Sequence, residues 1–453
     1  MLEKLFKLKE KGTNVKTEIM AGVTTFMTMA YILAVNPSIL GDAGMDTTAV
    51  LLATCFASFI GTAIMALWAN LPFALSAGMG LNAFMAYTVV QGFGYSWQIA
   101  LLAVFIEGII FIILSLTNVR EAIFDAIPMQ LKNAVSVGIG LFIAFIGLQN
   151  AGLSVDNGST LVSIVSFTDN FTTSGISALL AILGTILTAI LYIKGVKGSI
   201  LIGIIATWIV GMLCQLIGIY VPDAAGYYSL YPTLSLTDFT SLGKTFGQCF
   251  NVNFDGVSIF NFIVIIFSFL FVDLFDTLGT LIGVSTKSNM LDENGKLPGI
   301  KPALMADAIA TSAGAVFGTS TTTTFVESSA GVAAGGRTGL TSMTTAILFL
   351  ISMLFAPIFT AIPSFATAPA LIIVGFLMLT NIKELKLDDS NLTTAIPAYL
   401  CIIAMPLFYS IAEGISIGII SYVVINLISK KGKEISPIMY VLAVLFVLKY
   451  IFL

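Results

Sequence analysis

A succession of long apolar segments, separated by short polar intervals, constrains this sequence more than any other feature. An α-helix needs about 20 apolar residues to cross a bilayer. Segments of this kind lie at 17–36, 48–68, 73–90, 97–117, 131–150, 175–193, 199–218, 257–285, 302–318, 320–336, 340–357, 366–382, 391–409 and 411–430. A further apolar stretch, 437–453, is compatible with an additional crossing or with a helix on the membrane surface. The sequence therefore predicts an all-α polytopic membrane protein with 14 transmembrane segments.

Composition supports this prediction and argues against several kinds of function. Charged residues make up only 10% of the 453 residues, whereas a soluble domain averages about 25%. The chain contains no histidine, which excludes histidine-dependent catalysis and histidine metal sites. Its four cysteines are scattered without a C-x-x-C pair, so a cysteine metal site is not expected. We expect no enzymatic activity, no metal, no other cofactor and no nucleic-acid partner.

The positions of Lys and Arg predict how the chain is oriented, because cytoplasmic loops of membrane proteins are enriched in these residues. With a cytoplasmic N-terminus, 18 of the 20 Lys and Arg residues fall in intervals on the cytoplasmic side. The intervals on the other side carry Asp residues and a single base, Lys244. We therefore predict a multi-pass protein of the plasma membrane with both flanks in the cytoplasm. Two regions lie outside its crossings, an amphipathic N-terminal segment (1–16) and an extracellular loop (219–256). A C-terminal segment (431–453) follows the 14 crossings.

The division into two halves of seven segments has a structural consequence. A unit with an odd number of crossings, repeated once, must be inverted in the membrane, and inverted repeats are common in secondary transporters. The third segment (71–87) and the tenth (318–336) occupy matching positions, and both contain small polar and Gly-rich stretches. Residues 320–324 (STTTT) would form a poor helix interior, because threonine favours strands. We expect short extended strands in both segments, and two ordinary packing helices rich in Ser, Thr and Gly are the alternative.

Five carboxylates lie well inside the predicted crossings, at least five residues from either end: Glu107, Asp273, Asp276, Asp307 and Glu327. An ionisable residue at this depth is costly and is a functional candidate by default. No Lys or Arg is predicted at a comparable depth. We therefore expect these acids to be protonated, hydrogen-bonded or bound to a ligand. For Asp307 a position near the cytoplasmic interface is the alternative, and for Glu107 a bond to the backbone of a neighbouring helix or to a Ser or Thr.

Three of these acids have neighbours that suggest a role. Asp273 and Asp276 are three residues apart and share a helix face, and two close carboxylates in a low-dielectric environment cannot both ionise easily. This suits a proton carrier, and a hydrogen-bonded structural pair is the alternative. Glu327 precedes the stretch SSAGVAAGG, and a half-helix that starts there would stabilise its charge. An ionised carboxylate only accepts hydrogen bonds, so it selects a ligand with adjacent N–H donors; helix capping is the alternative.

Four motifs make the sequence recognisable. They are AGVTTFMTMAYILAVNP (21–37), LPFALSAGMGLNAF (71–84), FVDLFDTLGTLIGV (271–284) and ADAIATSAGAVFGTSTTTTFVESSAGVAAGGRTGLTS (306–342). In this order they resemble the nucleobase/ascorbate transporter superfamily, and specifically its AzgA-like branch of adenine/guanine/hypoxanthine permeases. The resemblance implies the fold of the uracil permease, in which two inverted repeats of seven segments form a core and a gate domain. The core would comprise 17–117 and 257–357, and the gate 131–218 and 366–430.

The resemblance also implies roles for particular residues. In this family an acid on the eighth segment and another on the tenth hold the nucleobase, and Asp273 and Glu327 match these by their motifs. Thr277 stands where uracil permeases have a histidine, so Asp276 is the candidate substitute in the proton step. Proton coupling would then involve Asp273, Asp276 and Glu327. Four smaller polar residues would complete the substrate site: Thr25, Thr28, Asn82 and Thr277.

Together, the acids and the resemblance predict a secondary active transporter. It would import purine nucleobases, namely guanine/hypoxanthine and/or adenine, by proton symport. Its partners would be the nucleobase, protons, the lipid bilayer and, as is common in this family, a second copy of the chain in a homodimer. An anion permease of the sulfate type would share the architecture and is the alternative. Such a permease would bind its ligand at half-helix N-termini, where Glu327 would place a negative charge of its own.

Overall fold

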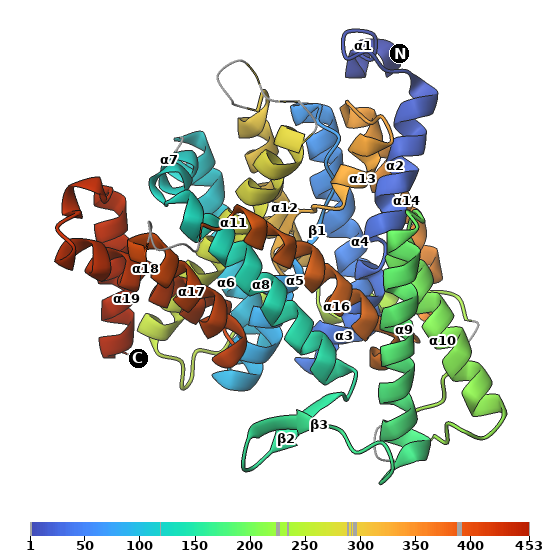
Figure 1. Ribbon diagram of the computed structural model, residues 1–453. Helices are drawn as coiled ribbons and strands as arrows, with labels where there is room; N and C mark the ends of the chain where they lie inside the picture. Colours follow the sequence, from blue (N-terminus) through green and yellow to red (C-terminus); the bar gives the residue numbers. More distant parts are fainter. Residues whose placement is uncertain are drawn as a thin grey trace.

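The structure of the protein is a computed structural model that describes residues 2–117, 119–222, 227–232, 235–287, 290, 292, 297–386 and 392–452 (Figure 1). In this part of the chain, eleven helical spans are long and apolar enough to cross a membrane. The prediction of a polytopic helical membrane protein is thereby confirmed. Residues 223–226 and 233–234 of the predicted loop 219–256 lie outside the described residues.

Helices account for most of the described chain. Those of the first half are α1 (Leu2–Phe6), α2 (Val15–Met29), α3 (Ile32–Asp42), α4 (Thr47–Ile64), α5 (Met79–Ala83), α6 (Trp97–Leu116), α7 (Val119–Ala126), α8 (Met129–Asn150), α9 (Ile176–Ile193) and α10 (Ser199–Leu216). Those of the second half are α11 (Ile259–Lys287), α12 (Ile300–Phe317), α13 (Ser328–Ala333), α14 (Gly339–Ser352), α15 (Ala356–Thr360), α16 (Ser364–Leu379), α17 (Leu392–Leu407), α18 (Ile411–Ile428) and α19 (Pro437–Phe452). Short 3₁₀ or π-helical stretches used below are η1 (Met65–Ala69), η2 (Phe84–Gly92), η4 (Phe239–Lys244) and η5 (Gln248–Phe250). The strands are β1 (Leu75–Ala77), β2 (Ser154–Asn157), β3 (Leu161–Ile164) and β4 (Thr322–Thr324).

The long helices pack in two groups. One group consists of α2, α4, α6, α11, α12 and α14, and the other of α8, α9, α10, α16, α17 and α18. The groups meet where α11 contacts α8 and α18, and where α2 contacts α10. The shorter helices α5 and α3 add contacts to α8 and α16, respectively. They occupy the chain ranges that the family resemblance assigns to a core and a gate, and that functional division remains a prediction.

The first predicted crossing, 17–36, is interrupted in the structure between α2 and α3, at residues 30–31. The hydroxyl groups of Thr24 and Thr28 donate to backbone carbonyl groups one turn earlier in α2, at 2.8 and 3.1 Å. Such bonds compete with the helical backbone and often bend a helix. The break places the side chain of Tyr31 in the interior, where it is 1% exposed.

The two interrupted segments predicted at 71–87 and 318–336 are present. β1 and β4 pair in an antiparallel arrangement with Ser76 opposite Thr323, and α5 and α13 follow the two strands (Figure 1). The strands satisfy each other's backbone groups, which is a requirement for extended chain at membrane depth. Because they run in opposite directions, α5 and α13 leave the pair in opposite directions as well.

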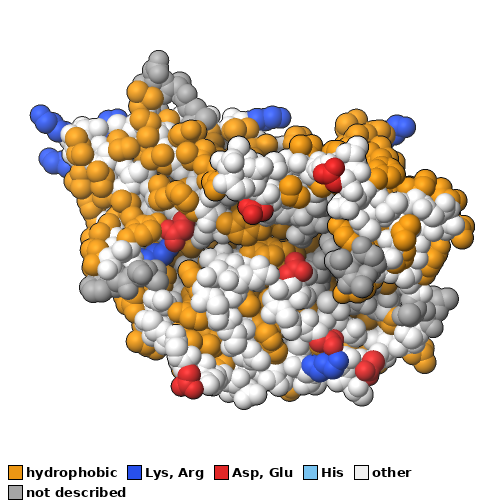
Figure 2. All heavy atoms as spheres, turned by 90° about the horizontal axis from the view of Figure 1, so that it is seen from below, with side chains coloured by type: hydrophobic (Ala, Val, Ile, Leu, Met, Phe, Trp, Pro, Cys, Tyr) orange, Lys and Arg blue, Asp and Glu red, His pale blue; other side chains and the backbone are white. Residues whose placement is uncertain are grey.

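The structure adds a hairpin, β2 and β3, that the sequence analysis does not predict. Its turn is stabilised by Asn157, whose side-chain oxygen accepts hydrogen bonds from the backbone N–H groups of Ser159 and Thr160 (2.9 and 3.1 Å), a frequent role of asparagine in turns. The hairpin projects from the end of the molecule opposite the N-terminus (Figure 1). Figure 2 shows the molecule from this end, with acidic side chains scattered over a hollowed face and hydrophobic side chains on the flanks.

The N-terminal helix is shorter than the predicted amphipathic segment 1–16. α1 covers only Leu2–Phe6, and the next residue, Lys7, adopts a left-handed backbone conformation (φ 54°), which a continuing right-handed helix does not allow. Phe6 and Leu8 lie buried against η1 and α14. This segment is therefore attached to the helices beside it.

Ion pairs attach two further regions to the helices. The C-terminal stretch forms α19, whose buried Lys449 pairs with Glu413 of α18. The predicted loop 219–256 contains the short helices η4 and η5. Lys244, at the end of η4, pairs with Asp46 at the start of α4, with Nζ and Oδ2 2.6 Å apart.

Candidate functional site

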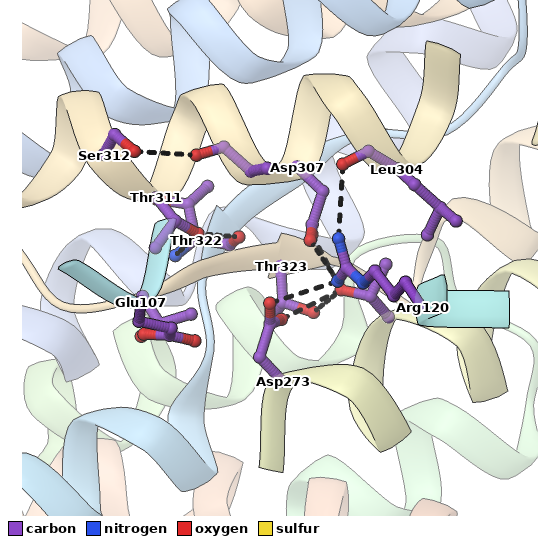
Figure 3. A network of polar contacts seen from close by, with 12 residues as sticks. Glu107, Arg120, Asp273, Leu304, Asp307, Thr311, Ser312, Thr322 and Thr323 are labelled. Carbon is purple, nitrogen blue, oxygen red and sulfur yellow. Dashed lines mark hydrogen bonds and ion pairs between the residues drawn. The ribbon is translucent and has the colours of Figure 1, made fainter. Parts of the chain in front are cut away.

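A buried polar network surrounds Arg120, a residue of the short helix α7 (Figure 3). Its Nη2 atom donates to Oδ2 of Asp307 (2.6 Å) and to Oδ2 of Asp273 (3.2 Å), and its Nη1 atom donates to the carbonyl oxygen of Leu304 (3.2 Å). The guanidinium carbon lies 3.8 Å from the centre of the Phe111 ring, which is a favourable position for a cation. All three charged side chains are 0% exposed.

This network corrects the expectation that no base reaches the buried acids. Arg120 lies in a charged stretch between two apolar segments, so the sequence alone assigns it to a polar interval. In the structure α7 packs against α6 and α11, and its arginine side chain points inward. Asp273 and Asp307 are therefore members of a buried ion-pair network. Asp307 is itself fully buried within the protein.

Thr277 joins this ion-pair network to the paired strands. Its hydroxyl oxygen lies 3.0 Å from Oδ1 of Asp273, 2.7 Å from Oδ1 of Asp307 and 2.7 Å from the hydroxyl oxygen of Thr323 in β4. A hydroxyl group has one proton to donate and two lone pairs that accept, so these bonds depend on one another. Thr277, expected in the substrate site, is fully buried at this junction.

Glu107 of α6 contacts the chain at β4 on the face that also carries Thr323. Thr321, directly before the strand, donates its hydroxyl proton to Oε2 of Glu107 (2.7 Å). Thr321 and Thr323 are two residues apart, so their side chains point to the same face of the extended chain. The hydrogen bond to a neighbouring segment, one of the two expectations for Glu107, is present. The other carboxylate oxygen, Oε1, is buried and has no hydrogen-bond partner among the described residues.

A second acidic cluster lies where β4 leads into α13. The Tyr31 hydroxyl group donates to Oε1 of Glu327 (2.5 Å), and the Thr28 hydroxyl group donates to the backbone carbonyl of Glu327 (3.4 Å). Glu327 directly precedes α13, as predicted, but its side chain makes no capping bond to that helix. The half-buried carboxylate is therefore held by a tyrosine from another helix.

Asp276 belongs to this second cluster. Its carboxylate interacts electrostatically with those of Asp307 and Glu327, and its Oδ2 atom lies 3.5 Å from the position that a Cβ atom on Gly78 would take. Asp276 is half-buried, whereas Asp273 is fully buried beside Arg120. Residues three apart in a helix are rotated by about 60° from each other. The structure thus directs the two acids of the predicted proton-carrying pair into different clusters.

Two other expected site residues are buried in the packing around the strands. The side-chain oxygen of Asn82 in α5 accepts a hydrogen bond from the Ser320 hydroxyl group, and its amide nitrogen has no partner in the described part of the chain. The Thr25 hydroxyl oxygen would lie 2.0 Å from a Cβ atom on Gly331. Thr25 therefore fills the space beneath α13, while Asn82 retains an unused N–H donor beside the strands.

The sequence patterns do not single out two residues of these clusters, Tyr31 and Arg120. Tyr31 lies within the motif 21–37, and a tyrosine in the middle of an apolar crossing was a usable signal, because a buried tyrosine hydroxyl group usually has a polar partner. For Arg120 the sequence offers a weaker signal. A single arginine in a short interval between apolar segments is equally typical of an ordinary charge in a cytoplasmic loop.

Comparison with known proteins identifies the family of the chain. The sequence profile of the Permease family matches residues 16–419. The adenine permease AdeP of Escherichia coli K12 is 41% identical over 100% of this chain and 96% of its own length. The guanine/hypoxanthine permease PbuG of Bacillus subtilis 168 is 44% identical over 100% of both chains.

Solved structures share the fold at low sequence identity. The transmembrane domain of the cyanobacterial bicarbonate transporter BicA superposes with a TM-score of 0.62 and 15% identity, covering 88% of this chain and 97% of that one. SLC26A9, whose murine counterpart is described as an anion transporter, superposes with a TM-score of 0.59 and 13% identity, covering 92% of this chain and 66% of that one. The sequence relatives are much closer, and they confirm the resemblance to adenine and guanine/hypoxanthine permeases. The chain belongs to the Permease family and is a membrane transporter, not an enzyme.

Proposed function

We propose that this permease imports purine nucleobases, namely guanine/hypoxanthine and/or adenine, across the plasma membrane. The observation that carries the proposal is the half-buried pair of acids Glu327 and Asp276 in a chain with full-length relatives named as purine-base permeases. In the described part of the chain, no basic side chain forms an ion pair with either acid. A neutral ligand with several N–H groups would compensate for them.

The chemistry of a purine base suits this cluster. Guanine carries a ring N–H group beside an exocyclic amino group, and a carboxylate can accept both hydrogen bonds. We assign this role to Glu327, whose orientation Tyr31 supports, and we place Asp276 as the second acid that faces the base. Asp273, the acid implied by the family motif, is less suited because Arg120 already engages it.

Donors for the acceptor atoms of the base are available nearby. The amide group of Asn82 has a free N–H, and the first turn of any helix leaves backbone N–H groups without helical partners. The start of α5 would provide such groups beside the strand pair, whereas the first N–H groups of α13 already donate to the carbonyl groups of residues 325–327. Thr28 would support the site through the backbone of Glu327. Thr25 and Thr277 would support it from behind, through Gly331 and Thr323 respectively.

The arrangement in the membrane follows the same proposal. Eleven spans, the helix α17 and the two interrupted segments around β1 and β4 would make 14 crossings in two inverted repeats of seven. The antiparallel pairing of β1 and β4 is what an inverted repeat would produce. We assign the two helix groups to a core and a gate, and the N-terminus to the cytoplasm, where the excess of basic residues favours it.

We propose that a proton gradient drives uptake, with the base and a proton carried together by symport. Buried carboxylates can bind and release protons as their surroundings change, and the described interior contains Glu107, Asp273, Asp276, Asp307 and Glu327. The anion permease alternative has support only from the fold shared with BicA and SLC26A9. An anionic ligand would be repelled by Glu327 and Asp276, so we favour the neutral base.

An uptake assay tests this function. Cells that lack their own nucleobase permeases would express the chain and receive labelled adenine, guanine, hypoxanthine, uracil or sulfate. We expect uptake of at least one purine, no uptake of uracil or sulfate, and loss of purine uptake when a protonophore is added. Uptake of sulfate without any purine would contradict the proposal.

Matched variants make this assay specific for the site. Glu327→Gln preserves the size of the side chain and removes its charge, so purine uptake should be lost while the protein still reaches the membrane. Glu434→Gln removes an exposed carboxylate and should leave uptake unchanged. Equal uptake by both variants would show that Glu327 does not hold the substrate.

A further inference from the structure

The charges around Arg120 do not balance. Glu107, Asp273, Asp307 and Arg120 are each 0% exposed. Figure 3 shows Asp273 and Asp307 beside the guanidinium group of Arg120, while Glu107 lies to one side of them, near the chain at β4. If all three acids were ionised, two negative charges would remain uncompensated in the protein interior, which is strongly unfavourable. At least one of these acids therefore needs a proton or another cation.

The contacts indicate which acid lacks compensation. Asp273 and Asp307 each form an ion pair with Arg120, and each lies within hydrogen-bonding distance of Thr277. Glu107 has no ion-pair partner among the described residues. It receives one hydrogen bond, from Thr321, and its Oε1 atom is buried without a partner. A buried charge with so little support is costly, so the protonated form suits this position.

The other charged groups near Glu107 come from three helices. α12 contributes Asp307, α11 contributes Asp273, and α7 contributes Arg120. The remaining elements packed against α6 are η2 and η5. Their titratable residues are Tyr87, which donates to Asp42, and the free Cys249. Arg120 is already engaged by two acids, so it leaves Glu107 as the least compensated member.

Glu107 is also connected to the proposed substrate site through the chain around β4. The carbonyl oxygen of Thr321 accepts a hydrogen bond from the backbone N–H of Gly78 (3.0 Å), and Gly78 lies beside Asp276. The residue before Thr321 is Ser320, which donates to Asn82. A change in the bond between Glu107 and Thr321 would thus alter the chain next to Asp276 and Asn82, two proposed ligand-binding residues.

We propose that Glu107 is a proton-binding site of the transport cycle, separate from the nucleobase site, and that the chain around β4 links the two sites. The inference rests on the proposed function as a proton-driven nucleobase importer. In the cycle, the ionised carboxylate takes one proton from the side on which the base enters. The same proton leaves on the opposite side after the base is released, so the charge of Glu107 is restored.

The hydrogen bond between Glu107 and Thr321 can change direction in this step. Ionised Glu107 can only accept the bond, so Thr321 must donate its hydroxyl proton. Protonated Glu107 can instead donate to the Thr321 oxygen, and the hydroxyl proton of Thr321 is then free to turn elsewhere. The reversal needs no large movement, and it alters the residue whose carbonyl group holds Gly78.

Purified protein in proteoliposomes tests the inference. Four quantities would be measured: purine binding as a function of pH, purine exchange without a gradient, accumulation driven by a pH gradient, and proton uptake in a weakly buffered solution containing a pH dye. Glu107→Gln resembles the protonated form, so it should bind and exchange purine while losing gradient-driven accumulation, proton uptake and the pH dependence of binding. Glu107→Asp keeps a titratable group and should retain part of the coupling, and Glu434→Gln should behave as the unchanged protein.

The outcomes separate the inference from the function on which it rests. If the unchanged protein binds no purine, the proposed substrate is wrong. If it exchanges purine but does not accumulate it in response to the pH gradient, or depends on sodium instead, proton coupling is wrong. The proposed role of Glu107 is then wrong as well. If it is proton-driven and Glu107→Gln accumulates purine with the same proton uptake, only the inference is overturned. Should Glu107→Gln fail to fold, Glu107→Asp decides, because unaltered pH dependence in that variant would also contradict the inference.

Discussion

The two acidic clusters near β4 differ in how their charges are compensated. Asp273 and Asp307 are fully buried and share the guanidinium group of Arg120. Glu327 and Asp276 are half-buried and form no ion pair within the described part of the chain, and the hydroxyl group of Tyr31 donates to Glu327. The first cluster is largely satisfied within the protein, except at Glu107. The second retains acceptor capacity that a ligand can use. Acids three residues apart in one helix can thus serve different purposes.

The largest effect should follow from removing the base of the first cluster. Arg120→Met leaves Asp273 and Asp307 without their cation, and breaking a buried pair in this way typically costs about 3–5 kcal/mol. We expect a strongly reduced melting temperature of the detergent-solubilised protein, measured by fluorescence-detected size exclusion after heating. Lys383→Met, which removes an exposed base, is the control. Equal stability of the two variants would mean that Arg120 does not compensate the acids.

A second change in the same cluster sharpens this test. In the double variant Arg120→Met/Asp307→Asn, one of the two carboxylates that have lost their cation is made neutral as well. Contacting residues do not have additive effects, so the double variant should be more stable than Arg120→Met alone. A further loss of stability on adding Asp307→Asn would show that the two residues act independently.

An intermediate effect is expected in the second cluster. Tyr31→Phe removes the hydroxyl group that donates to Glu327, and a hydrogen bond to a charged group contributes roughly 1.5–3 kcal/mol. Since Glu327 would lose its fixed orientation, purine affinity should fall while the melting temperature changes little. Isothermal titration calorimetry of the purified protein measures the affinity. A large loss of stability with normal affinity would place Tyr31 in the structural cluster instead.

The smallest effect should come from an ion pair outside both clusters, between Asp46 and Lys244. Burial tends to raise the pKa of Asp46, but hydrogen bonds from Lys244 and from the backbone of Ala49 outweigh it, so the pKa lies below its usual value. Exposed ion pairs contribute about 0–1 kcal/mol. Lys244→Ala should therefore lower the melting temperature only slightly at neutral pH.

The pH dependence of this small effect has a definite sign. A carboxylate whose pKa is lowered in the folded protein stabilises it above the unfolded-state pKa, and this contribution is lost as the pH falls through the folded-state pKa. The difference in melting temperature between the unchanged protein and Lys244→Ala should thus vanish in acid. A difference that grows in acid would contradict this assignment for Asp46.

Much of the fold was predictable because it depends on patterns that are local in the sequence. Apolar segment length indicates helices that cross a membrane, and the threonine run 320–324 indicates a strand because threonine fits extended chain better than a helix interior. The break at residues 30–31 was missed because the threonines and the tyrosine around it also fit an uninterrupted helix. The β2–β3 hairpin was missed because its strands are only four residues long.

The candidate site was harder to predict because it depends on contacts between distant segments. Glu327 is recognisable from its position before a Gly-rich stretch. The direction in which Asp273 and Asp276 point depends on the small rotation between them and on what each meets in space. Arg120 meets Asp273 only because α7 folds back against α6 and α11, and no spacing in the sequence records that contact.

Purine binding to two matched variants tests the central claim most directly. Calorimetry would compare Glu327→Gln and Asp273→Asn with the unchanged protein, using adenine, guanine and hypoxanthine at neutral pH. Truncating one partner of a buried charge-assisted pair costs roughly 2–5 kcal/mol, so Glu327→Gln should abolish measurable binding. Asp273→Asn should bind purine with nearly unchanged affinity, because Asp273 contacts Arg120 and not the ligand. Lost binding in Asp273→Asn together with normal binding in Glu327→Gln would contradict the assignment of the two clusters.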